Sequence, residues 1–357
     1  MGELAADAGI TSEELALAAR NHAMPLEALR WPVTPVGLHY LLIHFDVPLV
    51  DASSWRLELG GRVQRPLSLS LDELRARPAE ELVATMECAG NGRALLEPRP
   101  RSQPWLTGAV GTGRWRGAPL DALLADAGLE ADAVELVFTG LDRGIDGGEE
   151  QLYARSLTPA DAAGSLLAYE LNGQPLPPQH GFPLRLVVPG WYGMTNVKWL
   201  GSITAVETPF AGFQQVEAYR LRAEEGADGP PVTRMQPRAL LVPPGIPDFF
   251  TRSRMIEPGS TRLEGRAWSG QAPIARVEVS TDDGETWADA ELFRDLDSRW
   301  AWCGWRLIWE AEPGEHVLCC RAYDEAGNAQ PLGASWNVGG YENNAVQRVP
   351  VSVTGRP

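Results

Sequence analysis

The chain has 357 residues, of which 44% are hydrophobic and 22% charged, and its formal net charge is −16. This length exceeds one typical domain, and the composition is that of an ordinary soluble globular protein, so we expect two domains. The acidity argues against a general nucleic-acid-binding or anionic-membrane-binding surface, because both need clustered basic charge.

Residues 1–20 lack the features of a targeting segment. They contain acidic residues, no apolar stretch of a secretory signal and no twin-arginine sequence, and no run long enough to span a membrane occurs in the chain. Cys88, Cys303, Cys319 and Cys320 fit neither a zinc site nor a disulfide framework. Cys319 and Cys320 alternate along a predicted strand and are expected on opposite faces. We therefore expect a cytoplasmic protein with reduced cysteines.

The first part of the chain predicts strands that alternate with short helices. A helix is expected over residues 11–21, because Thr11 and Glu14 have the spacing of a capping box. Residues 31–48 are expected to be extended, with a core strand at 41–45. Further strands are predicted at 55–59, 82–86, 133–140 and 184–188, and helices at 71–77 and 119–127. This order predicts an α+β fold, and no G-x-G-x-x-G follows a strand, so a dinucleotide site is not supported.

A turn-rich break at residues 223–232 separates this part from a purely β pattern. The strands predicted after the break are 262–268, 275–280, 288–292, 306–309 and 316–323. Their regular spacing is typical of an immunoglobulin-like sandwich. The predicted domains are an N-terminal helical extension at 1–30, a mixed α/β domain at 31–227 and the sandwich at 228–357.

Cys88 is the first candidate for chemistry. It follows the apolar run 82–86 and stands where the chain turns sharply through Gly90-Asn91-Gly92. A thiol at such a corner has a fixed direction, and the nearby Arg93 favours the thiolate, which is the form that binds a soft metal. A small buried hydrophobic cysteine fits this run equally well.

A second group of candidates consists of charged and imidazole side chains in three other runs. His180 and Arg185 flank a rigid Gly-Phe-Pro step and would suit a phosphate or pterin edge, or else form a core histidine and a surface arginine. Lys198 follows a glycine-bounded loop and could clamp a phosphate or be a solvated strand residue. Taken alone, the sequence around His44 predicts a histidine in the core, and the sequence around Asp142 predicts a plain turn.

Together these runs resemble the sulfite oxidase family of molybdenum enzymes. The motifs are Cys-Ala-Gly-Asn from Cys88, Leu-Ala-Tyr-Glu-x-Asn-Gly from Leu167 and His-Gly-Phe-Pro-x-Arg from His180, followed by Val-Val-Pro-Gly and Val-Lys-Trp-Leu. Runs beginning at Gly265 and Arg276 resemble the dimerisation domain of the same family. The resemblance covers roughly residues 35 to 355.

The resemblance implies a molybdopterin-binding oxidoreductase domain followed by an immunoglobulin-like dimerisation domain, and hence a homodimer. Cys88 would be the protein ligand of molybdenum, which also takes the dithiolene of molybdopterin and oxo ligands. Tyr219 would be the active-site tyrosine, whose phenol can donate a hydrogen bond or relay a proton. The positions that hold the pterin and its phosphate in the family match His44, Asp142, His180, Arg185, Asn196, Val197 and Lys198.

Three departures from the family concern its anion-binding arginines. Leu42, Thr195 and Gly339 stand where the family has arginines that bind sulfite or nitrate. Losing one charge-assisted contact costs about 1.5–3 kcal/mol, so losing several weakens the affinity for a dianion. Oxidation of sulfite to sulfate by oxygen-atom transfer is the default prediction, and a less charged substrate such as an S-oxide is the alternative.

Two further predictions concern the partners and the class of function. No Cys-x-x-Cys-His haem motif is present, so we expect an external electron carrier such as a cytochrome, besides a small-molecule substrate. A non-catalytic binding protein with the same fold, or a cysteine hydrolase using Cys88 and His180, are the other classes that the residues allow.

Overall fold

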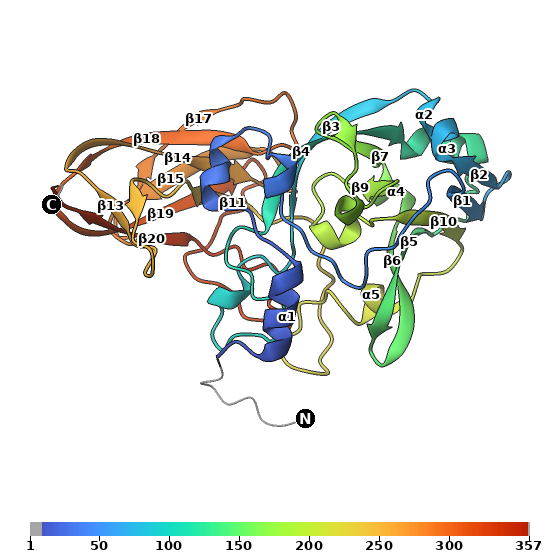
Figure 1. Cartoon of the computed structure of the whole chain (residues 1–357), viewed down its shortest axis with the longest axis horizontal. Coiled ribbons are helices and arrows are strands. Elements are labelled where there is room, and N and C mark those ends of the chain that lie inside the picture. Colours follow the sequence, from blue (N-terminus) through green and yellow to red (C-terminus); the bar gives the residue numbers. More distant parts are fainter. Residues whose placement is uncertain (1–8, 356–357) are drawn as a thin grey trace.

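The computed structural model describes residues 9–355, which form four β-sheets in two groups (Figure 1). The first group uses strands between residues 56 and 206, and the second uses strands between 238 and 353. The predicted order, a mixed α/β part followed by an all-β part, is confirmed. The boundary at 227–228 stays a prediction.

The first group consists of two five-stranded sheets. One has the order β2 (Leu67–Ser70), β1 (Arg56–Gly61), β10 (Leu200–Val206), β5 (Glu135–Asp146), β6 (Glu149–Leu157), in which β1 and β10 are parallel. The other has the order β3 (Glu80–Glu87), β4 (Val110–Pro119), β7 (Leu166–Leu171), β8 (Gln174–Pro175), with β9 (Arg185–Val187) also paired to β7.

The second group is a sandwich of a four-stranded and a six-stranded sheet. The smaller has the order β11 (Arg238–Leu241), β14 (Gly259–Trp268), β18 (Cys303–Ala311), β17 (Glu291–Phe293). The larger has the order β12 (Ile246–Pro247), β13 (Arg254–Ile256), β20 (Gln347–Val353), β19 (Gly314–Asp324), β15 (Ile274–Ser280), β16 (Ala288–Asp289). Inward-facing side chains of both sheets, among them Val277, Trp305 and Leu318, form its core.

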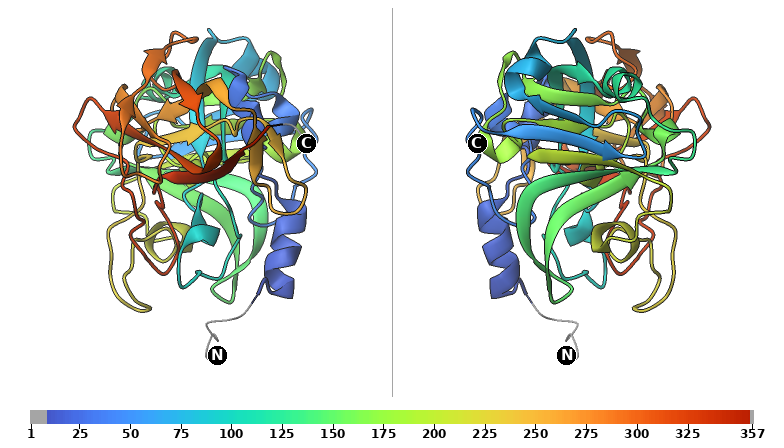
Figure 2. Two further views of the ribbon diagram at one scale, coloured as in Figure 1. Left: turned by 90° about the vertical axis from the view of Figure 1, so that its left-hand side faces the viewer. Right: turned by 90° about the vertical axis from the view of Figure 1, so that its right-hand side faces the viewer.

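Helices are few and short in the described residues. The α-helices are α1 (Ser12–Arg20), α2 (Leu71–Arg75), α3 (Leu120–Ala127), α4 (Pro159–Ala162) and α5 (Phe213–Val216). The 3₁₀-helices are η1 (Leu26–Arg30), η2 (Val36–Leu38), η3 (Arg93–Leu95), η4 (Pro178–His180) and η5 (Gly193–Thr195). In both views of Figure 2, α1 projects from the body of the chain on the side where the N-terminus lies.

The local sequence explains where two of these helices begin and end. The capping box expected at α1 is present, because the Thr11 side chain accepts a hydrogen bond from the Glu14 N–H and the Glu14 carboxylate accepts one from the Thr11 N–H. Helix α3 buries Leu120 and Leu123 against the first group of sheets and ends at Gly128, which adopts the left-handed conformation with φ of 70°.

The prediction of a core strand at residues 41–45 is wrong. These residues form only one isolated bridge, between His22 and Leu41. Side chains from elsewhere occupy the backbone groups that a strand would pair: Asn21 Oδ1 accepts from the Ile43 N–H at 2.8 Å, and Lys198 Nζ donates to the Leu42 carbonyl at 2.6 Å. His44 therefore lies in a loop and not on a strand.

The single strand predicted at 288–292 is also divided. Ala288–Asp289 joins the six-stranded sheet and Glu291–Phe293 the four-stranded sheet. The N–H of Ala290 still donates to the Val277 carbonyl of β15 at 2.9 Å, so the chain passes from one sheet to the other directly after Ala290. The remaining predicted strands and helices match observed ones, with ends that differ by a few residues.

The two groups of sheets share buried contacts. Tyr192 and Met194 from the first group pack in one hydrophobic cluster with Leu240, Trp268 and Trp302 from the second. All four cysteines are free, and Cys320 packs in the sandwich core while the Cys319 sulfur lies 3.7 Å from the Asp283 carboxylate. Across residues 9–355, no helix is long and apolar enough to cross a membrane.

Candidate functional site

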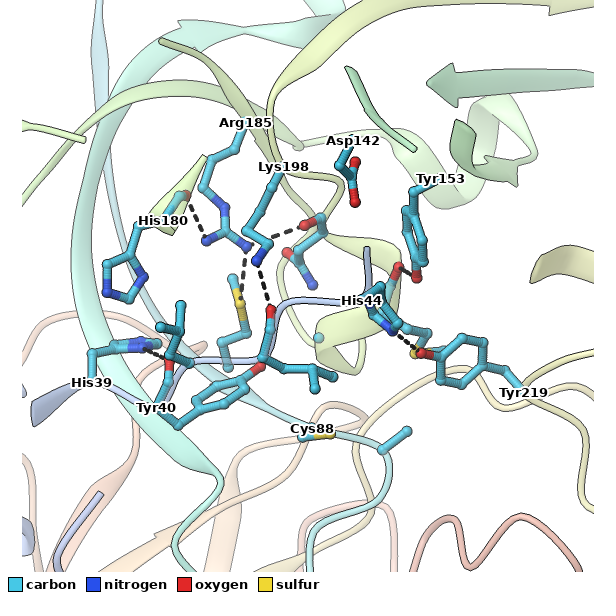
Figure 3. A pocket seen from close by; sticks show the side chains of 17 residues that line it. His39, Tyr40, His44, Cys88, Asp142, Tyr153, His180, Arg185, Lys198 and Tyr219 are labelled. Carbon is cyan, nitrogen blue, oxygen red and sulfur yellow. Dashed lines mark hydrogen bonds between the residues drawn. The ribbon is translucent and has the colours of Figure 1, made fainter. Parts of the chain in front are cut away.

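One pocket beside the first group of sheets collects residues from five separate parts of the sequence (Figure 3). Eight of the residues singled out from the sequence line it: His44, Cys88, Asp142, His180, Arg185, Asn196, Lys198 and Tyr219. Val197 packs in the hydrophobic core beside the pocket, and its proposed contact with a ligand stays a prediction. The fold thus brings together runs that are separated by up to 175 positions.

Cys88 is the sulfur donor of this pocket. It follows directly on β3, its N–H donates to the Ala109 carbonyl at 2.9 Å, and its carbonyl accepts from the Asn91 N–H at 2.9 Å. Gly92 then takes a φ of 91°, which glycine adopts without strain. A Cβ at Gly90 would come within 2.6 Å of the Arg93 guanidinium, so glycine is needed there for close packing.

Burial and charge act in opposite directions on the Cys88 thiol. Burial raises the pKa of Cys88, while the Arg93 guanidinium lowers it by less. Arg93 therefore favours the thiolate, as expected, but the cost of burying a charged thiolate is larger than this effect. A bound metal ion would supply the missing stabilisation, because a coordinating thiol is deprotonated.

Arg185 is a buried cation held by neutral partners. Its guanidinium donates to the carbonyls of His180 at 3.2 Å and Asn196 at 3.1 Å, and lies 3.4 Å from the sulfur of Met86. Among the residues that the structure describes, its Nε has no hydrogen-bond partner. Burial lowers the pKa of this guanidinium to about 10, which leaves it charged at neutral pH.

Lys198 and Asp142 face the same pocket and influence each other. The Lys198 ammonium donates to the Leu42 carbonyl at 2.6 Å, and a longer contact of 3.5 Å reaches the Gln179 carbonyl. Burial lowers the pKa of Lys198 to about 7, and burial raises the pKa of Asp142 to about 6. Within residues 9–355, neither Lys198 nor Arg185 has a carboxylate at ion-pair distance.

His180 and Asn196 complete the wall around these cations. Burial lowers the pKa of His180 to about 2, assisted by the neighbouring His39 and Arg185, so its imidazole is neutral. Asn196 Oδ1 accepts from the Val188 N–H at 2.7 Å, and its amide donates to the Tyr192 carbonyl at 3.1 Å. These bonds fix the side-chain amide.

Tyr219 and His44 form a direct hydrogen-bonded pair at the other end of the pocket. The Tyr219 hydroxyl contacts His44 Nε2, and the His44 ring stacks on Tyr153 with 4.6 Å between ring centroids. Burial lowers the pKa of His44 to about 3, so the neutral imidazole accepts a hydrogen bond from the phenol when its proton is on Nδ1. Tyr219 has a φ of 51°, an uncommon backbone conformation for a residue with a side chain.

Several residues of the site escaped the sequence analysis. Tyr153 lines the pocket, and Arg155 on the same face of β6 places its guanidinium 5.6 Å from the Tyr219 ring centroid. Arg155 is buried, has an unpartnered Nε and donates to the Gln214 carbonyl. His39 is buried on the opposite side with its Nε2 unpartnered. The alternation of Tyr153 and Arg155 along a strand was the one local signal that could have pointed to them.

The three positions without the family's arginines differ in their surroundings. Leu42 lines the pocket, Thr195 is completely buried with an unpartnered hydroxyl, and the Gly339 carbonyl accepts from Arg93 Nε at 2.8 Å. A Cβ at Gly339 would lie 2.2 Å from the Tyr341 ring. An arginine at 339 would therefore require Tyr341 to move.

The donor set fits a molybdenum–pterin cofactor. No group of three or more His, Cys, Asp or Glu side chains among the described residues could hold a metal by itself. The pocket offers one thiol, the buried Arg185 and the partly buried Lys198, and within residues 9–355 neither cation has a carboxylate at ion-pair distance and Arg185 Nε has no hydrogen-bond partner. These donors suit a soft metal carried by an anionic organic group.

Comparisons with known proteins agree with this fit. Residues 44–214 match the oxidoreductase molybdopterin binding domain model, and residues 247–354 match the Mo-co oxidoreductase dimerisation domain model. Sulfite oxidase of Gallus gallus is 37% identical over 335 residues, which cover 88% of this chain and 72% of that protein. The mitochondrial sulfite oxidase of Mus musculus is 35% identical over 344 residues, covering 90% of this chain and 62% of its own length.

More distant relatives extend the comparison. A nitrate reductase of Hordeum vulgare is 32% identical over 350 residues, covering 90% of this chain and 39% of the relative. The crystal structure of the sulfane dehydrogenase SoxCD from Paracoccus pantotrophus has a TM-score of 0.80 and 24% identity, covering all of this chain and 96% of that chain, which shows the shared fold. The chain spans about 62% of the length of the mouse and rat sulfite oxidases that it matches. It belongs to the sulfite oxidase family of molybdopterin-dependent oxidoreductases.

Proposed function

We propose that the chain oxidises a small sulfur substrate by oxygen-atom transfer, with sulfite as the first candidate. Sulfite and water would give sulfate, two protons and two electrons, which leave to an external carrier such as a cytochrome. The observation that carries the proposal is the meeting, in one pocket, of the Cys88 thiol with the buried Arg185 and the partly buried Lys198.

The residues of the pocket divide into two proposed roles. Cys88 would ligate the molybdenum, and Arg185, Lys198 and the fixed Asn196 amide would hold the anionic pterin and its phosphate. The remaining proposed contacts to the cofactor come from His44, Asp142, His180 and Val197. When bound, the cofactor supplies a two-electron redox centre for oxygen-atom transfer.

Tyr219 would act on the substrate side of the pocket. Its phenol donates to the neutral His44 imidazole, and its ring is held between Tyr341, at 5.1 Å, and the Arg155 guanidinium. Burial raises the pKa of Tyr219 well above its usual value, so the hydroxyl keeps its proton. When His44 instead carries its proton on Nε2 and donates to the phenol oxygen, the single O–H of Tyr219 is free to donate to a reacting oxygen without ionising.

Arg93 and Arg155 favour an anionic substrate, although Leu42 stands where the family has an arginine. Arg93 is buried, donates to the carbonyls of Gly339 and Gln103, and stacks on Tyr341 with 5.3 Å to the ring centroid. Within residues 9–355, neither Arg93 nor Arg155 has a carboxylate at ion-pair distance. These cations leave a positive field near Cys88 and Tyr219.

A less charged substrate such as an S-oxide is the second candidate. The observation that favours it is Leu42, which presents an aliphatic side chain in the pocket wall where the family has a guanidinium. A cysteine hydrolase is not favoured, because His180 has a pKa of about 2 and no hydrogen bond joins it to Cys88 among the described residues. A binding protein that retains the fold without turnover remains the non-enzymatic alternative.

Three accompanying features remain proposals. The chain forms a homodimer through residues 228–357, it passes electrons to a separate carrier, and it works in the cytoplasm. The match of residues 247–354 to a dimerisation domain supports the first of these.

The proposal is tested with purified protein from a host that makes the molybdenum cofactor. Molybdenum is measured by mass spectrometry, and turnover is followed with sulfite plus ferricyanide, and separately with a methyl sulfoxide plus a reduced dye. We expect molybdenum near one per chain and sulfite-dependent reduction of ferricyanide. Cys88→Ser should lower turnover at least about 100-fold. Protein without molybdenum, or a Cys88→Ser variant with full activity, would refute the assignment.

A further inference from the structure

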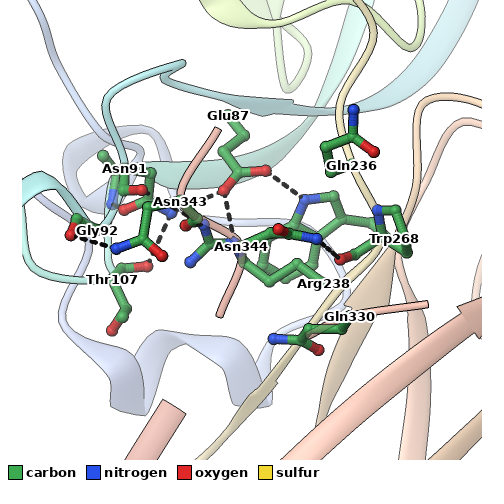
Figure 4. Close-up of polar contacts among 12 residues, drawn as sticks. Glu87, Asn91, Gly92, Thr107, Gln236, Arg238, Trp268, Gln330, Asn343 and Asn344 are labelled. Atoms are coloured by element: carbon green, nitrogen blue, oxygen red, sulfur yellow. Dashed lines mark hydrogen bonds and ion pairs between the residues drawn. The ribbon is translucent and has the colours of Figure 1, made fainter. Parts of the chain in front are cut away.

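A buried charge network joins the sandwich to the turn that carries Cys88 (Figure 4). Glu87, the residue before Cys88, is completely buried. Arg238 Nε of β11 lies 2.8 Å from Glu87 Oε1, and the Trp268 indole N–H of β14 donates to Oε2 at 2.8 Å. Asn91, on the Cys88 turn itself, donates to Oε1 at 2.9 Å. Two of the three partners of Glu87 thus come from the sandwich.

The sandwich also holds the backbone of the same turn. The Glu342 N–H donates to the Ala89 carbonyl at 2.9 Å, and the Asn343 amide donates to the Gly92 carbonyl at 2.7 Å. The Arg238 guanidinium reaches the Asn91 carbonyl at 3.3 Å. Three carbonyl groups of residues 89–92 therefore have donors from residues 238–343.

These contacts indicate that partners outside the turn determine its shape. A five-residue turn with two glycines has little conformational preference of its own, so its position depends on its partners. The partners surround the turn on the side of the sandwich, while the Cys88 sulfur faces the pocket. A change in Arg238 therefore reaches the thiol through the turn and touches no residue that lines the pocket.

We propose that Glu87, Arg238 and Trp268 are positioning residues that fix the direction of the Cys88 thiol, so that the sandwich is part of the metal site and not only a dimerisation unit. The positioning itself is independent of any metal. Its consequence for metal loading rests on the proposed function.

The test measures the reactivity of Cys88 in metal-free, full-length protein. Iodoacetamide labelling is followed by peptide mass spectrometry, which separates Cys88 from the three other buried cysteines. Arg238→Met should speed labelling of Cys88 about tenfold, and Trp268→Phe, which removes one hydrogen bond, by a smaller factor. Circular dichroism at the labelling temperature confirms that each variant is folded.

Arg254→Met is the matched control. Arg254 is an equally buried arginine of the sandwich, it pairs with Glu27 at 3.0 Å and donates to the Pro243 carbonyl at 2.8 Å, and it has no contact with the Cys88 turn. This variant should lose thermal stability and leave the labelling rate of Cys88 unchanged. Equal acceleration in both arginine variants, or none in Arg238→Met, would overturn the proposal. Should Arg238→Met not fold, Trp268→Phe decides by the same criterion.

Molybdenum content separates this inference from the proposed function. If wild-type protein binds molybdenum and Arg238→Met binds clearly less at equal folded concentration, both proposals are supported. If no variant binds molybdenum but the labelling rates differ as expected, the positioning stands and the proposed function fails.

Discussion

The pocket and the junction with the sandwich both bury cationic side chains, but they differ in how the charge is balanced. At the junction, the Arg238 guanidinium lies against the Glu87 carboxylate, and its Nη2 also donates to two backbone carbonyls. In the pocket, the hydrogen bonds of Arg185 and Lys198 go to carbonyl groups and to the Met86 sulfur, and no carboxylate within residues 9–355 lies at ion-pair distance from them. Because an isolated buried charge is expensive, the unbalanced cluster indicates a binding site for an anion, and the balanced one indicates a fixed joint.

The largest expected effect tests the balanced side of the comparison. Arg238→Met should lower the free energy of unfolding by about 3–5 kcal/mol, because the Glu87 carboxylate is left buried without its charged partner. Urea unfolding of metal-free protein measures this. The double variant Glu87→Gln/Arg238→Met should recover part of the loss. A loss below about 1 kcal/mol would mean that water reaches the junction.

Removing a cation from the pocket should change the stability of metal-free protein in the opposite direction. Lys198→Met is expected to raise the stability of metal-free protein at pH 6 by about 1–3 kcal/mol, since it removes a desolvated ammonium that has no carboxylate at ion-pair distance within residues 9–355. The same change should weaken retention of the cofactor, measured as molybdenum per folded chain. Destabilisation in metal-free protein would show that the ammonium is already balanced.

Adding a cation to the pocket tests how its charge affects the binding of an anionic substrate. Leu42→Arg should lower the KM for sulfite about tenfold or more, which is the value of one charge-assisted contact. It should also reduce the stability of the metal-free protein. Leu42→Met is the matched control, with similar volume and no charge. An unchanged KM for sulfite would favour the less charged substrate.

The smallest effect is a pH dependence of stability. The pKa of Lys198 is lowered to about 7 in the folded protein from a usual 10.5, so between these values the unfolded chain binds more protons. The free energy of unfolding should therefore rise with pH above about 7, by at most about 1.4 kcal/mol per pH unit. The raised pKa of Asp142 has the opposite sign but acts below about pH 6. Lys198→Met should abolish this slope, as should saturation with the cofactor, and a slope that survives in Lys198→Met would assign it to another group.

The sequence predicted the parts of the site that depend on local chemistry. The strand before Cys88, the sharp turn with its glycines and the stiff loop between His180 and Arg185 all follow from neighbouring residues. The family motifs then identified eight residues that do line one pocket. The strand at 41–45 failed, because an apolar run also fits a loop whose backbone groups are met by Asn21 and Lys198.

Only the tertiary structure decided how charge is distributed around Cys88. No sequence motif includes Arg155, Arg93 or the Glu87–Arg238 pair. Glu87 and Arg238 are 151 positions apart in the sequence. Whether an arginine is paired depends on which carboxylates come near it after folding, and a single sequence does not contain that information. By itself the sequence determined the family and the cofactor, and it predicts Cys88 as the thiol that would bind the metal. Packing between the two groups of sheets decided which buried charges are balanced and which are left for a ligand.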